Sequence, residues 1–374
     1  MKNILIKLTA AAFLLTILSA CNDPIFQDIS EQQKIEKPFI PGSPTNFVIY
    51  KGIDSENNLI NNKENLYVAS GGNIYKYDEN WHRINIRPGG DIFQLAANSG
   101  YLYALCLGAN SRGVIKRNTN PAFDQWESGW DEILNRNIQS IYAVNESDLF
   151  ICAQNLNGTF QIFYSNGGES FVPVPGAEET AFLRGVIFTG TEYILCAGNL
   201  YSYSGVPEEE AVKITEVSNF RGIINLGNNF AGITRDGRLY NINSEGIIGE
   251  LVSGLGGRYR ATGAIALWQS DAGSLLLVGR QDITYSTESG YTYGYMEIDV
   301  IDGVITGSFR EPGDETITTV SNKSSYRNSI GRNPVSYLIQ WSANAESEKI
   351  LYASTQRNGV WRLKEDWNAQ TRSN

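Results

Sequence analysis

The amino-acid sequence predicts an all-β protein, a seven-bladed β-propeller built from four-stranded antiparallel blades. Three observations lead to this prediction. From about residue 46, short runs rich in Ile, Val, Tyr, Phe and Leu alternate with turns rich in Gly, Asn and Asp. No long stretch has the period of a helix. One hydrophobic strand recurs seven times, and roughly 47 residues per repeat matches the length of one blade.

The recurring strand is expected to be the second strand of each blade. Its copies begin at Asn65, Tyr101, Asp148, Glu192, Asn229, Ser274 and Lys349. The preceding, innermost strands are expected at residues 47–50, 92–95, 138–144, 185–188, 222–226, 264–268 and 335–341. Stacking such sheets around an axis buries both faces of each sheet. Residues 39–50 are expected to supply the outermost strand of the last blade. A β-sandwich is the alternative, but it does not need seven copies of one unit.

The N-terminus has the layout of a secretory signal. Lys2 and Lys7 give a short positive start, and residues 8–18 form an apolar run without charge that is too short to span a bilayer. The next residues, Leu-Ser-Ala-Cys ending at Cys21, resemble the lipobox of bacterial lipoproteins. The resemblance implies cleavage before Cys21 and acylation of its thiol and new amino group by fatty acids such as palmitate. The alternative is an ordinary signal peptide with a chance cysteine.

These features predict three segments. Residues 1–20 are a lipoprotein signal peptide, residues 21–45 a lipidated N-terminus with a flexible tether, and residues 46–374 the propeller. The tether is polar, carries four prolines and reaches about 25–30 Å. Several acyl chains on one residue anchor a protein far better than one chain. We therefore expect a lipid-anchored protein of the bacterial cell envelope, at the outer membrane or cell surface, because Asn22 is not the Asp that favours inner-membrane retention.

Charge and rare residues narrow the function classes. The chain has 30 Lys and Arg against 40 Asp and Glu, a net charge of −10, which argues against a nucleic-acid partner. The one histidine, His82, is expected to be exposed on a polar outer strand rather than to act as a general base. Cys106, Cys152 and Cys196 lie in short apolar strands and are expected to be buried and free. No residue set predicts a metal site, a cofactor or a catalytic constellation.

Two hairpins resemble the Asp-box of sialidase-type (BNR-like) propellers, whose pattern is Ser-x-Asp-x-Gly-x-Thr-Trp. Residues 286–293 keep the Ser, Gly and Thr and place Glu288 and Tyr293 at the Asp and Trp positions. Residues 164–171 are a looser match. The resemblance implies membership of that superfamily. Since the box is a folding element there, it bears on the fold and not on activity.

Arginine placement supplies the candidate binding site. In six of the seven units an arginine lies just before the expected innermost strand. All innermost strands of a propeller run the same way, so these arginines would form a ring at one mouth and attract carboxylate, phosphate or sulfate. The six are Arg87, Arg136, Arg184, Arg221, Arg260 and Arg332. The alternative is that each arginine pairs with an acid or carbonyl of the neighbouring blade.

Aromatic residues give a second candidate surface. Tyr285, Tyr291, Tyr293 and Tyr295 crowd one segment, and Tyr259 and Trp268 precede it. Exposed tyrosines suit the recognition of proteins or sugars. The alternative is that they pack between blades.

The blades, the Asp-box-like hairpins, the lipid anchor and the arginines together are similar to the propellers of photosystem II assembly factors. The resemblance implies a scaffold that holds a protein partner, although nothing in the sequence indicates a photosynthetic one. We expect a monomeric, membrane-anchored, non-enzymatic binding or assembly platform for a protein or anionic ligand. The alternative is a sialidase-like or other glycan-active protein. Two carboxylates beside the arginines would favour hydrolysis, and a basic mouth without acids would favour binding.

Overall fold

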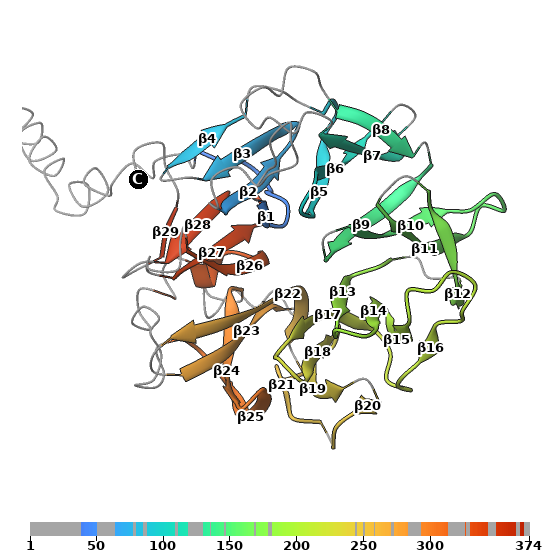
Figure 1. Ribbon diagram of the computed structural model, residues 1–374. Coiled ribbons are helices and arrows are strands. Elements are labelled where there is room, and N and C mark those ends of the chain that lie inside the picture. Colours follow the sequence, from blue (N-terminus) through green and yellow to red (C-terminus); the bar gives the residue numbers. More distant parts are fainter. Residues whose placement is uncertain are drawn as a thin grey trace, which may run out of the picture. The chain divides into compact units, whose positions relative to one another are not determined.

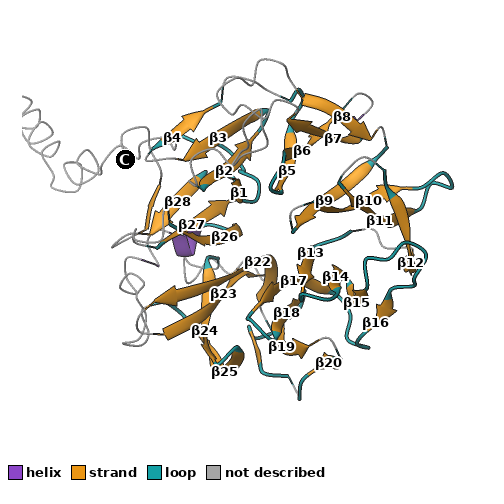
Figure 2. Cartoon of the chain, viewed as in Figure 1, coloured by secondary structure: helices purple, strands orange, loops and turns teal. Residues whose placement is uncertain are grey.

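The computed structural model describes most of the chain from Phe39 onward. The described residues are 39–50, 64–77, 80–84, 88–108, 111–118, 130–134, 136–145, 147–167, 170–178, 182–243, 245–249, 251–257, 259–270, 273–282, 293–312, 326, 330–342, 349–363 and 367–369. They are almost all strand and loop, with a short 3-10 helix at Ile330–Arg332 (Figure 2). No helix in these ranges has the length and apolar character that crossing a membrane requires.

The described strands form seven antiparallel sheets around a central axis, which confirms the predicted seven-bladed β-propeller (Figure 1). Blade 1 contains β1 (Val48–Tyr50), β2 (Asn65–Ser70), β3 (Asn73–Tyr77) and β4 (Trp81–Arg83). Blade 2 contains β5 (Ile92–Ala97), β6 (Leu102–Leu107), β7 (Gly113–Asn118) and β8 (Trp130–Leu134). Blade 3 contains β9 (Ile138–Val144), β10 (Asp148–Gln154), β11 (Phe160–Asn166) and β12 (Val172–Glu178).

The remaining blades follow the same order from the axis outwards. Blade 4 contains β13 (Gly185–Phe188), β14 (Tyr193–Ala197), β15 (Asn199–Tyr203) and β16 (Val212–Lys213). Blade 5 contains β17 (Phe220–Asn225), β18 (Phe230–Thr234), β19 (Arg238–Asn243), β20 (Gly246–Ile247) and β21 (Ser253–Gly254), the last two both pairing with β19. Blade 6 contains β22 (Tyr259–Ser270), β23 (Gly273–Asp282), β24 (Tyr295–Ile301) and β25 (Val304–Arg310). Blade 7 contains β26 (Val335–Trp341), β27 (Ile350–Thr355), β28 (Val360–Leu363) and β29 (Trp367–Ala369).

The ring closes differently from the prediction. Residues 39–50 do not supply the outermost strand of the last blade, because β29 fills that position and β1 is the innermost strand of blade 1. The four strands of blade 7 are therefore consecutive in the sequence, as they are in the other blades.

The N-terminal segment still joins the first and last blades. Gly359 donates a backbone hydrogen bond to Gly42 O at 3.0 Å. The Ser354 hydroxyl donates to Pro44 O at 2.8 Å, and Ile40 is fully buried. Residues 39–45, assigned above to the tether, thus pack against blade 7, and the compact unit that contains the propeller begins at Pro38.

Burial of the second strands explains why their sequences are continuous apolar runs. On β6, Leu102 and Ala104 pack with Tyr67 of blade 1. The alternate residues Tyr103 and Leu105 pack in the cluster that includes residues of β10 in blade 3. Because both faces of a central strand meet a neighbouring blade, apolar and polar residues do not alternate along it.

The three cysteines behave as the sequence predicts. Cys106, Cys152 and Cys196 are fully buried and form no disulfide, and they lie on the second strands of blades 2, 3 and 4. Burial raises the pKa of Cys106 and Cys196 to about 12 and that of Cys152 to about 11. A thiol with such a pKa carries almost no thiolate at neutral pH and is inert.

Side-chain amides fix neighbouring blades to each other. Gln94 on β5 donates from Nε2 to Ile141 O on β9 at 2.6 Å, and its Oε1 accepts from Ile141 N at 3.0 Å. Asn46 bonds both backbone groups of Leu95 in the same way. A primary amide reproduces the donor and acceptor of a peptide group. It therefore links innermost strands that are not themselves paired, which holds the mouth of the propeller in one geometry.

Candidate binding site at the propeller mouth

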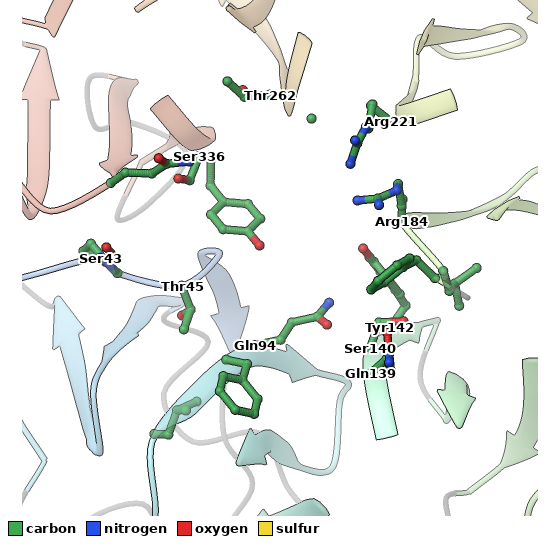
Figure 3. A pocket seen from close by; sticks show the side chains of 18 residues that line it. Ser43, Thr45, Gln94, Gln139, Ser140, Tyr142, Arg184, Arg221, Thr262 and Ser336 are labelled. Carbon is green, nitrogen blue, oxygen red and sulfur yellow. The ribbon is translucent and has the colours of Figure 1, made fainter. Parts of the chain in front are cut away.

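A cavity of about 500 Å³ opens at the axis of the propeller, where the innermost strands begin (Figure 3). Its lining comes from every blade. The residues are Ser43, Pro44 and Thr45 before β1, Ile92, Phe93 and Gln94 on β5, Gln139, Ser140 and Tyr142 on β9, Phe182, Leu183 and Arg184 before β13, Arg221 on β17, Thr262 and Gly263 on β22, Ser336 and Tyr337 on β26, and Gln356 after β27. A common direction for the innermost strands places all of these segments at one mouth.

Two of the predicted arginines project into this cavity. Figure 3 shows the guanidinium groups of Arg184 and Arg221 next to each other on one wall. Arg184 is fixed by its backbone, which donates to Cys196 O at 2.7 Å, and its guanidinium carbon lies 5.0 Å from the Phe182 ring centre. Neither arginine forms an ion pair with a carboxylate of the described residues. Both cations are therefore available to a ligand.

The electrostatics of Arg221 show that the positive charges are concentrated. Burial lowers the pKa of its guanidinium, and the charges of Arg184, Arg235 and Arg260 lower it further. An arginine remains charged even so, because its ordinary pKa is above 12. The repulsion among these groups is relieved when an anion binds between them.

The structure does not bring all six predicted arginines together. Arg87 lies outside the described residues. Arg136 lies over the Phe163 ring at 5.0 Å and is not part of the cavity lining. Arg332 is exposed at the end of the 3-10 helix and does not line the cavity either. Arg260 is exposed and lines a different hollow of the surface, not this cavity.

Strand geometry explains this difference. Arg184 lies one residue before β13, Arg136 lies two before β9, and Arg221 is the second residue of β17. Successive side chains of a regular strand point to opposite faces, but the register shifts between Phe220 and Gly222 in β17 and between Ala261 and Ile265 in β22. The offset from the start of the strand therefore does not by itself set the direction of the side chain. Similar spacing in the sequence therefore gives different orientations.

The sequence analysis missed two parts of the site. Arg235 lies in the turn between β18 and β19, and such turns between second and third strands lie at the mouth where innermost strands begin. That rule of topology could have identified it. The other part is an aromatic rim, because Phe93 and Phe182 are each 47% exposed and Tyr337 is 37% exposed. No sequence signal distinguishes these rings from ordinary core aromatics.

The lining has a definite chemical character. The described lining residues include no Asp or Glu, and they supply two arginines, several amides and hydroxyls, and aromatic rings. Burial raises the pKa of Tyr142, so its hydroxyl stays protonated and can donate a hydrogen bond. Arginine forks bind carboxylates bidentately, and aromatic rings contact apolar groups beside them. The cavity therefore suits an anionic group next to an apolar one.

The other predicted residues lie elsewhere. His82 is exposed on β4. Tyr295 and Trp268 are buried in the core cluster between blades 6 and 7, so they pack between blades. Cys21, Tyr285, Tyr291 and residues 286–292 of the first Asp-box-like hairpin lie outside the described residues. In the second hairpin, Tyr164 is buried on β11 and donates to Asp148 at 2.9 Å.

The fold and the cavity define a seven-bladed β-propeller with a basic opening at one mouth. The sequence matches no known protein-family model and no curated protein. Among solved structures, the chain is similar to YCF48 from Cyanidioschyzon merolae, with 11% identity and a TM-score of 0.51 over 87% of this chain and 96% of that one.

Two further solved structures are similar to the chain. YCF48 bound to D1 peptide is 11% identical, with a TM-score of 0.50 over 89% of this chain and 96% of that one. The WD40 β-propeller domain of Doa1 is 9% identical, with a TM-score of 0.51 over 90% and 95% of the two chains. At such identities the likeness shows the fold alone.

Proposed function

We propose that this chain is a non-enzymatic platform that holds an acidic segment of a partner protein in the mouth of the propeller. The observation that carries this proposal is the pair Arg184 and Arg221, which project into a cavity whose described lining has no carboxylate. Charge-assisted bidentate hydrogen bonds from arginine are among the stronger polar contacts that a protein can offer. A carboxylate placed between the two guanidiniums gains these bonds and relieves their repulsion.

The surroundings of the two arginines favour a protein partner. Aromatic residues and arginine are enriched at the energetically important positions of protein interfaces, and Phe93, Phe182 and Tyr337 are exposed around the cavity. The solved complex of YCF48 with a peptide supports the proposal, because it demonstrates that a propeller of similar fold holds a peptide. The glycan-active alternative requires a carboxylate pair, and the described lining offers none.

Site-specific photocrosslinking in cells tests the platform. Benzoylphenylalanine in place of Phe93, on the rim of the cavity, should capture one partner reproducibly, and mass spectrometry should map the crosslink to an acidic segment. The matched control is the same probe at Ile301, which is 58% exposed at the end of β24. That strand runs away from the mouth, so Ile301 lies at the opposite end of blade 6. Equal capture at both positions, or a crosslink to a segment without acids, would contradict the proposal.

We also propose that the platform is held at a membrane of the bacterial cell envelope through acylated Cys21. The support is the lipobox-like sequence that ends at this residue. A Cys21→Ser variant should not incorporate an alkyne analogue of palmitate, and it should leave the membrane fraction, because acyl chains bury many methylene groups in the bilayer. Labelling that persists in this variant would place the acyl group elsewhere.

A further inference from the structure

A second hollow, also of about 500 Å³, lies next to the cavity. It is lined by the loop before β17, the turn between β18 and β19, and the start of β22. Residues that are only two positions apart in the sequence line different spaces. Asn219 lines the second hollow and Arg221 lines the cavity, while Arg260 lines the second hollow and Thr262 lines the cavity. The two spaces therefore adjoin at the same mouth, separated by single residues of β17 and β22.

The second hollow has an excess of positive charge. Three arginines line it against two carboxylates, and both carboxylates already have partners. Asp236 accepts from the Thr234 hydroxyl at 2.5 Å and binds Arg238 Nε at 3.0 Å. Glu216 binds the ammonium group of Lys213 at 2.8 Å.

Two of the three arginines are left for a ligand. Arg235 and Arg260 are exposed, and neither forms an ion pair with a carboxylate of the described residues. The charges of both also act on Arg221, whose pKa they help to lower. The arginines of the cavity and those of the second hollow therefore interact electrostatically with one another.

The backbone of Arg235 is hydrogen-bonded through both its N–H and its carbonyl group. Its N–H donates to Asn219 O at 2.8 Å, and its carbonyl accepts from Ala261 N of blade 6 at 3.1 Å. Asn219 has a φ of 65°, a left-handed conformation that non-glycine residues adopt at a cost. These contacts fix the turn before any ligand arrives, and a preorganised site loses less entropy on binding.

We propose that the second hollow is a second anion-binding subsite, with Arg235 and Arg260 as its cations, and that the bound segment carries two separated acidic side chains, one for each space. This inference rests on the proposed function, because Arg184 and Arg221 hold the first acidic group. Joining two weak contacts in one chain makes the second contact intramolecular and raises the affinity without any other new interaction. Asp236 and Glu216 beside the hollow disfavour further acids next to the one that binds.

Calorimetric titration of the purified chain with end-blocked peptides tests the second subsite. All peptides have the same length and two glutamates. In the reference peptide both glutamates are next to a single phenylalanine. In the other peptides the first glutamate stays there, and the second lies at increasing distances along the peptide from the first. Because all the peptides carry the same net charge, non-specific electrostatic attraction to the protein is the same for each of them. We expect one spacing to bind about tenfold more tightly than the reference. The variant Arg235→Gln/Arg260→Gln should lose that gain, so that it binds every spacing with the same affinity as it binds the reference peptide.

The possible outcomes separate this inference from the proposed function. If all spacings bind as the reference does, the second subsite is wrong and the platform stands. If no peptide binds, the proposed function fails and the second subsite fails with it. The control variant Arg83→Gln/Arg112→Gln removes the same charge from exposed positions outside both spaces and should keep the preference for spacing. The spacing series on the unaltered chain decides the question even if a variant does not fold.

Discussion

Replacing Arg184 and Arg221 together by glutamate should abolish capture of the partner at the propeller mouth, with a loss of affinity of at least about a hundredfold. Removing one member of a desolvated charge pair at an interface costs about 2–5 kcal/mol, and reversal adds repulsion to that loss. The yield of the crosslink from benzoylphenylalanine in place of Phe93 measures the loss of partner capture in cells. Partial loss should already occur in the single variants, because the two guanidiniums flank the same space.

The fold should survive this double reversal. Neither arginine has a carboxylate partner among the described residues, so the change breaks no ion pair of the native structure there. The midpoint of urea unfolding should stay close to that of the unaltered chain. The matched control is Arg83→Glu/Arg112→Glu, which changes the net charge equally at exposed positions outside the cavity and should still capture the partner. Unfolding of the double variant would show that Arg184 and Arg221 are structural.

The sequence predicted the propeller well because its central strands carry a strong physical signal. A strand buried on both faces is apolar along most of its length, and seven such runs, six of them starting 36 to 47 residues apart, indicate repeated blades. The outermost strands have no such signal. β16 and β29 are short, and the exposed edge of a blade tolerates polar residues, so the closing strand could not be assigned from composition.

The candidate site was predictable only in part. The start of each innermost strand identifies the mouth, but the direction of each arginine depends on its offset from the strand and on the register shifts that interrupt the regular alternation of side chains. A shift of one residue separates Arg184, which lines the cavity, from Arg136, which lies over Phe163. Arg235 comes from a different loop and joins the group only through the tertiary fold.

One arginine that the sequence did not distinguish has a structural role, and its partners lie in its own blade 6, not in the neighbouring blade. The Arg280 side chain is 2% exposed, and its Nη2 binds the Glu311 carboxylate at 2.7 Å. Its Nε donates to Tyr293 O at 3.0 Å, and its guanidinium carbon lies 4.8 Å from the Tyr259 ring centre. This enclosure contrasts with the open cavity around Arg184, and it separates arginines that hold the fold from those available to a ligand.

Replacing Glu311 by glutamine should therefore destabilise the propeller by about 3–5 kcal/mol, because it leaves the charge of Arg280 buried without its carboxylate. The midpoint of guanidinium unfolding measures the loss. The matched control is Glu216→Gln, which removes the partner of Lys213. The Glu216 side chain is 95% exposed and that of Lys213 is 36% exposed, so water compensates and the cost should be below about 1 kcal/mol. Replacing both members, as Arg280→Met/Glu311→Leu, should recover most of the stability, since an apolar pair carries no desolvation penalty. If Glu311→Gln costs no more than Glu216→Gln, the pair does not stabilise blade 6.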